Sequence, residues 1–387
     1  MLVERMRAHT STIFAEMSAL ALRTGAINLG QGFPDTDGPA SLLSDAAANI
    51  QGGINQYPPG VGVPELRAAV AEHQRRFYGL DVDPDTVLVT TGATEAIASA
   101  VLALCEPGDE VVTFQPYYDS YAATIALAGA VIRPVPLRPS GLTFAFDPDE
   151  LRAAFSARTR LVLVNTPHNP TGTVFDREQL TRIGELAAEY DAVVVTDEVY
   201  EHMLYDGRPH VPMATLPGMA ERTLTISSAG KTFSVTGWKV GWVNGPGELV
   251  SAVRAAKQFL TYVSGAPFQP AIAAALGLPD SFYTGLAADL QRKRDLLSGG
   301  LREAGFSVFD TAGTYFVVTD VTPLGYTDGA EFCWSLPERV GVAAVPVSVF
   351  CADPELGRSL VRFAFCKRDE VLAEAASRLV ALRATAV

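Results

Sequence analysis

Short runs of apolar and β-branched residues recur through the middle of this chain and constrain its fold more than any other feature. They occupy residues 87–90, 111–114, 161–164, 192–196 and 223–227, and helix-like segments such as 64–77, 94–104 and 121–130 separate them. A strand with one face in water alternates apolar and polar residues, whereas a continuous apolar strand is buried on both faces. The pattern therefore predicts an α/β fold with a mostly parallel central sheet flanked by helices.

The two ends of the chain show a different pattern. Residues 1–40 lack the alternation of strands and helices and include a stretch rich in glycine and proline at 30–39. The C-terminal part is typical of a helix, a strand and a helix, then two strands and a last helix, at 281–304, 315–319, 329–340, 342–346, 359–365 and 370–382. We therefore predict a large domain over residues 41–270. A smaller α+β domain would combine an N-terminal arm (1–40) with residues 271–387.

Composition excludes several classes of protein. With 387 residues, 48% of them hydrophobic and 19% charged, the chain can bury a large core and is unlike a disordered protein. The net charge of −13 argues against broad binding to nucleic acid or to an anionic membrane. An anionic ligand would need a local cluster of positive groups instead.

Cysteine usage and hydropathy indicate where the chain resides. The four cysteines form no CxxC pair and have no metal-ligand spacing with the five histidines, so we expect a reducing compartment and no metal. The apolar stretch after Arg5 and Arg7 is broken by charges, and no apolar run reaches about 18 residues. We expect a cytoplasmic protein without a signal peptide or membrane span.

Two of the predicted strands end in segments that suit a ligand, and ligands of open α/β sheets bind beyond the carboxyl ends of strands. Residues 91–95, Thr-Gly-Ala-Thr-Glu, open a helix after the first strand and would let a phosphate reach its free amides. The alternative is an ordinary turn with a threonine cap. Asp197, in Asp-Glu-Val-Tyr200, is a carboxylate at a buried strand end and needs a partner. The alternative is a helix cap.

Lysine is rare in this chain, with 5 of the 30 basic residues, and two lysines follow the strand at 223–227. Lys231 and Lys239 lie among small and hydroxyl residues in Ser228-Ala-Gly-Lys-Thr-Phe-Ser234 and Thr236-Gly-Trp-Lys-Val-Gly-Trp242. A partly desolvated amine is nucleophilic at neutral pH and suits covalent chemistry with a carbonyl group. A solvated loop lysine is the alternative. A phosphate-binding P-loop is excluded because Thr225 stands where that motif requires glycine.

Three further segments contain candidate site residues. Residues 165–172, Asn-Thr-Pro-His-Asn-Pro-Thr-Gly, hold two prolines that constrain the backbone after the third strand. Tyr118 could stack on a flat ligand or pack in the core. Arg362 lies in the apolar strand 359–365, where its guanidinium could bind a ligand carboxylate or form an internal ion pair.

Together and in this order, these segments resemble the class I/II aminotransferases of the fold-type I pyridoxal-phosphate (PLP) enzymes. Residues 28–34, 55–57, 169–172, 197–200 and 228–242 are similar to the branch that contains the kynurenine aminotransferases. Residues 14–18, 118–121, 199–202 and 362–367 resemble the subgroup of actinobacterial N-succinyldiaminopimelate aminotransferases. The likeness covers essentially the whole chain. It is highly specific for the cofactor and less specific for the substrate.

The resemblance implies a role for each candidate residue around PLP. Lys231 would form the Schiff base with the cofactor and move the substrate proton. Asp197 would pair with the pyridine nitrogen, Tyr200 and Asn169 with the ring hydroxyl, and Tyr118 would stack on the ring. The phosphate would be held by residues from several loops, namely Ala93, Thr94, Ser228 and Lys239. Relatives carry a serine in the turn 92–94 that this chain lacks, so phosphate binding there would depend more on backbone amides.

The resemblance also implies how the substrate is held and how subunits associate. Arg362 would bind the substrate α-carboxylate with the help of Gly32 and Asn169, and Phe14 would line the side-chain pocket. Tyr57 would reach the phosphate of the neighbouring subunit, which implies a homodimer with composite active sites. The Asn169–Pro170 peptide bond would be cis.

The implied reaction is a ping-pong transamination between an amino acid, with glutamate as the expected donor, and a keto acid. The expected enzyme is an N-succinyldiaminopimelate aminotransferase of lysine and diaminopimelate biosynthesis. Alternatives are a transaminase of kynurenine, glutamine or another aromatic or sulfur amino acid, and a PLP-dependent cysteine-conjugate β-lyase. A PLP-binding transcriptional regulator is a further alternative. It would need an added DNA-binding module, and the aminotransferase motifs begin near residue 28, so we expect no such module before them. An α/β protein without PLP is the last alternative.

Overall fold

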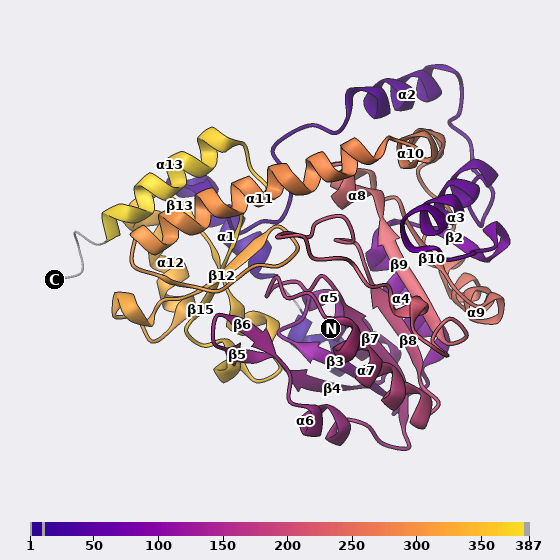
Figure 1. The fold of residues 1–387 in the computed structure, drawn as a ribbon, viewed down its shortest axis with the longest axis horizontal. Coiled ribbons are helices and arrows are strands. Elements are labelled where there is room, and N and C mark those ends of the chain that lie inside the picture. Colours follow the sequence, from indigo (N-terminus) through magenta and orange to yellow (C-terminus); the bar gives the residue numbers. More distant parts are fainter. Residues whose placement is uncertain (1, 10–11, 383–387) are drawn as a thin grey trace.

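The computed structural model describes residues 2–9 and 12–382, and a mixed sheet forms its centre (Figure 1). The strand order is β2-β10-β9-β8-β7-β3-β4. The bounds are β2 (Val87–Thr90), β3 (Glu110–Gln115), β4 (Val131–Pro136), β7 (Thr159–Asn165), β8 (Val193–Asp197), β9 (Thr223–Ser228) and β10 (Gly241–Asn244). The pairs among β4, β3, β7, β8 and β9 are parallel, while β10 runs antiparallel to both β9 and β2. The predicted α/β fold is confirmed, and β10 is the antiparallel exception.

Both faces of the central sheet are covered by helices, which explains the continuous apolar strands. In β7, Leu161 and Leu163 pack on one face with α4 (Gly92–Leu104), α5 (Asp119–Ala128) and α9 (Gly247–Lys257). Val162 and Val164 pack on the opposite face with α6 (Pro148–Ala153) and α7 (Arg177–Glu189). Successive side chains of a strand point to opposite faces, so burial on both faces requires apolar residues at every position.

A second, antiparallel sheet is built from the C-terminal part of the chain. Its order is β11-β12-β15-β14, with β11 (Ser307–Val308), β12 (Phe316–Asp320), β14 (Val345–Pro346) and β15 (Leu360–Ala364). The helices beside it are α11 (Asp280–Glu303), α12 (Gly329–Val340) and α13 (Asp369–Val380). The strand predicted at 342–346 is divided into β13 (Val342–Ala343) and β14, which belong to different sheets.

The N-terminal arm joins this second body. The helix α1 (Ile13–Thr24) packs against α12, and β1 (Ile27–Asn28) pairs in parallel with β13. The proposed division into two domains stays a prediction. Its boundary at residue 270 falls within α10 (Phe268–Leu276), which packs against α2 (Ala40–Gln51) and α3 (Pro64–Tyr78).

The remaining elements are short or lie beside the site. Among them are the hairpin of β5 (Arg138–Ser140) and β6 (Thr143–Ala145), the short helix α8 (Ala229–Thr232) directly after β9, and several 3₁₀ turns. The Asn169–Pro170 bond is cis, as predicted, and Gln115–Pro116 and Thr166–Pro167 are cis as well. Within the described residues, no helix is both long and apolar enough to cross a membrane.

Candidate active site

A cavity of about 360 Å³ lies where the loops after β2, β3, β7, β8 and β9 meet the second sheet and the N-terminal arm. These strands run in one direction, so their carboxyl ends share one edge of the sheet. All but one of the predicted site residues line this cavity: Phe14, Gly32, Ala93, Thr94, Tyr118, Asn169, Asp197, Tyr200, Ser228, Lys231, Lys239 and Arg362. Segments far apart in the sequence are therefore brought together at one place.

The amine of Lys231 projects into this cavity from α8. It lies 5.8 Å from the ring centroid of Tyr200 and 5.6 Å from that of Tyr315. Burial lowers the pKa of Lys231 to about 8, although Cys366 and Asp197 act in the opposite direction. Near neutral pH a sizeable share of the amine is therefore unprotonated, which is the form that attacks an aldehyde or removes a proton.

The carboxylate of Asp197 stands at the end of β8 and is only 5% exposed. Burial raises the pKa of Asp197, and the opposing influences include a 2.6 Å hydrogen bond from the Tyr121 hydroxyl and a bond from the Val199 amide. A protonated ring nitrogen of a ligand would be a further partner of this carboxylate. Sequence analysis did not name Tyr121 as a site residue, although it ends the segment 118–121.

The start of α4 has the features that suit an anion. The first amides of a helix have no partner within the helix and carry partial positive charge. Gly92 has a φ of +73°, and a Cβ at this position would lie 3.2 Å from the Lys239 amine, which shows how closely that amine approaches the helix. A Cβ on Gly241 would lie 2.6 Å from the Gly92 carbonyl carbon. Together with Ala93 and Thr94, this arrangement suits a phosphate group.

Asn169 is held in place by a chain of hydrogen bonds across two strand ends. The backbone N–H of Asn169 donates to the side-chain oxygen of Asn165 at 2.7 Å. The side-chain NH₂ group of Asn165 donates in turn to the backbone carbonyl of Asp197 at 2.9 Å. Asn165 is a cavity residue that sequence analysis did not name, although the segment 165–172 contains it. The two asparagines couple the loop after β7 to the loop after β8.

Arg362, on β15, is 1% exposed, and none of the described acidic side chains forms a salt bridge with it. Its guanidinium donates to the Asn169 side-chain oxygen at 2.8 Å and to the Gly30 carbonyl at 3.0 Å. Its Nε makes no hydrogen bond, and no salt bridge joins it to a carboxylate in the part of the chain that the structure describes. Burial lowers the pKa of Arg362 to about 10. A buried, unpaired cation is costly, so this side chain is poised for a ligand carboxylate. The internal ion pair considered above does not form.

Aromatic rings and a tight glycine complete this side of the cavity. The Arg362 Cζ lies 3.9 Å from the ring centroid of Phe316 and 5.3 Å from that of Phe14. A Cβ on Gly32 would lie 2.4 Å from the Phe316 ring, so only glycine fits there. The Tyr315 hydroxyl donates to the Gly32 carbonyl at 2.5 Å.

Tyr57 is the predicted residue that does not line the cavity. Its side chain is 82% exposed and contacts the ring of Tyr262 with centroids 5.6 Å apart. Its predicted role involves a second subunit and stays a prediction. Further cavity residues were not named from the sequence: Gln31, Phe33, Gly92, Ile97, Tyr121, Asn165, Val199, Gly230, Thr236, Val240 and Phe316. Most adjoin segments that the sequence analysis did single out.

Comparison with known proteins gives consistent results. The sequence model of the aminotransferase class I and II family matches residues 24–379. The chain is 55% identical to a Mycobacterium tuberculosis protein named Probable N-succinyldiaminopimelate aminotransferase DapC, over 99% of this chain and 98% of that protein. It is 42% identical to the methionine aminotransferase of Escherichia coli K12, over 95% of both chains.

A solved structure shows the same arrangement of the chain. The N-succinyldiaminopimelate aminotransferase of M. tuberculosis superposes with a TM-score of 0.97 at 56% identity, covering 99% of this chain and 100% of the other. Members of this family depend on PLP in general. The protein is an aminotransferase with the fold-type I architecture, and the chain belongs to the class I and II aminotransferase family.

Proposed function

We propose that this aminotransferase uses PLP to transfer the amino group of glutamate to N-succinyl-2-amino-6-ketopimelate, on the route to diaminopimelate and lysine. One observation carries the proposal: Arg362, without a carboxylate partner in the described chain, faces the same cavity as the Lys231 amine. Amino acids and keto acids share an α-carboxylate next to the reacting carbon. A cavity with one cation for that carboxylate and one amine for the chemistry suits both half-reactions.

The residues present fit PLP. Lys231 lines the same cavity as the start of α4 and Lys239, which suit the cofactor phosphate. Asp197 would hold the ring nitrogen, Tyr200 and Asn169 the ring hydroxyl, and Tyr118 one face of the ring. When bound, PLP would supply the electron sink that makes the substrate α-proton removable.

The residues of the chain would have separate roles in the reaction. Arg362 would bind the two oxygens of the α-carboxylate with two parallel N–H groups, and its stack on Phe316 fixes the plane of the guanidinium. Lys231 Nζ, with a pKa of about 8, would remove the proton from the substrate α-carbon and return it later in the reaction. The rings of Phe14 and Phe316 lie against the guanidinium and would shield the bound carboxylate from water.

The substrate proposal rests on similarity and on space. Identity is 55% to the protein named for N-succinyldiaminopimelate and 42% to the methionine aminotransferase. A second hollow of about 610 Å³ borders the cavity at Phe14 and Tyr118, and a long substrate arm would extend toward it. Transamination of kynurenine, glutamine or a sulfur amino acid is the second candidate.

Steady-state kinetics with the purified enzyme test the proposal. We expect kcat/KM for glutamate-dependent amination of the succinylated keto acid to exceed that for methionine and for kynurenine by at least about tenfold. A preference for kynurenine or methionine would overturn the substrate proposal. Pyruvate release from a cysteine conjugate without added keto acid would instead favour the β-lyase.

A cytoplasmic location stays a prediction. We also propose that the enzyme acts as a homodimer in which Tyr57 of one subunit contributes to the active site of the other. Exposed aromatic side chains near Tyr57 support the dimer. Tyr262, whose ring contacts that of Tyr57, is 50% exposed, and Phe259 in the same segment after α9 is 83% exposed. Large apolar groups that gather on a surface usually mark a contact with another molecule.

A further inference from the structure

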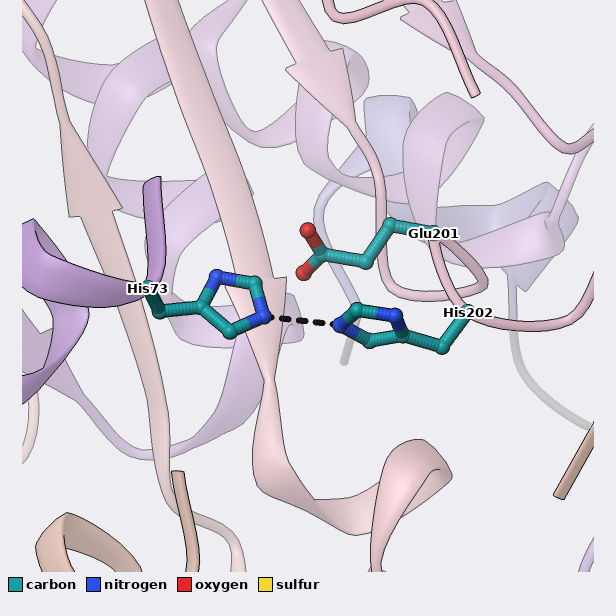
Figure 2. A group of neighbouring side chains, drawn as sticks. All are labelled: His73, Glu201 and His202. Carbon is teal, nitrogen blue, oxygen red and sulfur yellow. Dashed lines mark hydrogen bonds between the residues drawn. The ribbon is translucent and has the colours of Figure 1, made fainter. Parts of the chain in front are cut away.

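The geometry points to a binding site for one divalent transition-metal ion of the Zn²⁺ class, formed by His73, Glu201 and His202 outside the catalytic cavity. His73 comes from α3, and the other two follow β8 and Tyr200 (Figure 2). One ligand atom of each residue lies within 4.8 Å of the ligand atoms of the other two. Figure 2 shows the two rings and the carboxylate turned toward a common point.

Glu201 supplies a buried negative charge that neutral groups hold in place. The side chain is 3% exposed, and its two oxygens accept hydrogen bonds from the hydroxyls of Tyr78 at 2.7 Å and Ser227 at 2.6 Å. A group that accepts a hydroxyl hydrogen at each oxygen behaves as an ionised carboxylate. The hydroxyls orient the carboxylate without neutralising it, and each oxygen keeps a lone pair for a cation.

The two histidine rings face each other through a pair of nitrogen atoms, the atom type that zinc prefers. Their Nε2 atoms lie 2.7 Å apart, so one ring donates its proton to the lone pair of the other.

A metal ion would take the place of this hydrogen bond, and the proton would move to the Nδ1 atom of its own ring, which leaves a lone pair on both Nε2 atoms. Tetrahedral zinc, with bonds to nitrogen of about 2.0–2.1 Å, sets its two nitrogen ligands about 3.3 Å apart, so the rings need to separate by roughly half an ångström. Two imidazole nitrogens and one carboxylate oxygen are donors that zinc prefers. Calcium and magnesium prefer oxygen ligands alone, which excludes them as the favoured occupants.

The surroundings favour a cation of this kind. The rings of Phe77 and Tyr283 lie 4.8 Å and 4.4 Å from the His202 ring and shield the site from water. His202 is only half-buried, which leaves an entry on its side. The positive charge nearby belongs to Arg76, and it is paired with Asp280. His210 donates to or accepts from Glu198 at 2.7 Å and is not a ligand.

No metal site was expected from the sequence because His73 lies far from Glu201 and His202 along the chain. His73 and His202 are 129 positions apart, so no short spacing reveals them, and only the fold joins α3 to the turn after Tyr200. A bound ion would fasten α3 to this turn and to Ser227, next to the cavity residue Ser228. The site is therefore structural and lies behind the catalytic cavity.

Zinc binding to the PLP-loaded enzyme tests the inference. The protein is stripped with a chelator, loaded with Zn²⁺ and desalted, and zinc is measured by mass spectrometry for the wild type and for His202→Gln. His9→Gln is the matched control, since it removes a half-buried histidine elsewhere. We expect about one zinc per chain in the wild type and the control, and an affinity at least about tenfold weaker in His202→Gln. Equal zinc binding by all three proteins, or no zinc in the wild type, would overturn the inference.

A second measurement needs no variant and guards against misfolding of His202→Gln. X-ray absorption at the zinc edge of the loaded wild type reports the atoms bound to the ion. Two imidazoles with a remaining shell of oxygen would support the site. Sulfur ligands would place the ion at a cysteine, and fewer than two imidazoles would place it on the surface; either result contradicts the proposal.

Discussion

The Tyr121 hydroxyl donates a 2.6 Å hydrogen bond to the Asp197 carboxylate, inside the cavity and away from water. Tyr121 is 2% exposed, so this bond is formed in a medium of low polarity, where hydrogen bonds to a charge are strong. Burial raises the pKa of Asp197 and this bond opposes the rise. Tyr121 therefore helps keep Asp197 ionised for its proposed pairing with the ring nitrogen of PLP.

Replacing Tyr121 by phenylalanine should weaken that pairing. We expect the pKa of Asp197 to rise and kcat to fall by about tenfold or more, because a hydrogen bond to a charged group contributes roughly 1.5–3 kcal/mol. The retention of PLP on dialysis, followed by its absorbance, gives a readout separate from activity. Tyr117→Phe is the control, since Tyr117 is buried nearby and does not belong to the described lining. Equal PLP retention and equal kcat in both variants would contradict this role.

Lys231→Ala should abolish transamination. Without the amine, no group at this place can remove the proton from the substrate α-carbon, and we expect kcat to fall by at least about a thousandfold. Lys293→Ala is the control because Lys293 pairs with Asp289 on α11, far along the chain from the cavity loops. Activity of Lys231→Ala close to that of Lys293→Ala would show that the catalytic group lies elsewhere.

Arg362→Lys should weaken binding of every substrate that carries an α-carboxylate. Lysine cannot replace a planar, two-edged donor, and its shorter reach leaves Asn169 and Gly30 without their present hydrogen bonds. We expect kcat/KM to fall roughly 100-fold for both the amino donor and the keto acid.

A simple amine without a carboxylate provides the matched comparison for Arg362→Lys. Its slow single-turnover reaction with the PLP-loaded enzyme does not use the guanidinium, so the wild type and the variant should react at similar rates. A variant that loses this reaction to the same extent as the carboxylate substrates would indicate general damage rather than loss of a binding group.

Uptake of the cofactor should depend on pH through Lys231. Because burial lowers the pKa of Lys231 to about 8, the free amine of the cofactor-free enzyme is neutral above that pH and protonated below it. The reaction of the cofactor-free enzyme with added PLP should therefore slow by about tenfold for each pH unit below about 8 and level off above it. Rapid mixing with absorbance detection measures this rate. A rate that still rises steeply up to pH 10 would mean that the amine is not desolvated.

Much of the fold could be predicted from the sequence, since local patterns sufficed for the buried strands. The continuous apolar runs of β7 and β8 predict burial on both faces, and the structure shows it. β10 (Gly241–Asn244) was not predicted because only Trp242 and Val243 are apolar, while glycine begins the strand and the buried polar residue Asn244 ends it. The parallel pairing of β1 with β13 joins the two ends of the chain, and such a distant contact leaves no local pattern.

The candidate site could likewise be predicted only in part from the sequence. Lys231 and Asp197 stand out in the sequence because their residue types are unusual at strand ends. Tyr121 does not, because its function depends on the direction of one hydroxyl group within α5. The missing acidic partner of Arg362 is likewise a property of the folded chain, since many carboxylates exist that could have paired with it.

Tyr57 gives the last prediction, which concerns the proposed composite site. In the described chain it is exposed and lies outside the cavity, so any part it plays in binding phosphate must come from a second subunit. Tyr57→Phe should then lower the affinity for PLP and the activity at limiting PLP. Mixing subunits with Lys231→Ala tests the arrangement directly, because each mixed dimer would contain one site with an intact Lys231 and an intact Tyr57 from the partner.

The mixture has a quantitative outcome. Tyr57→Phe alone is impaired and Lys231→Ala alone is inactive, but random reassociation of equal amounts gives half mixed dimers, each with one of two sites intact. Activity at limiting PLP should therefore reach about a quarter of the wild-type value. If Tyr57 served the site of its own chain, every site in the mixture would carry one of the two defects, and activity would not rise above that of Tyr57→Phe diluted twofold.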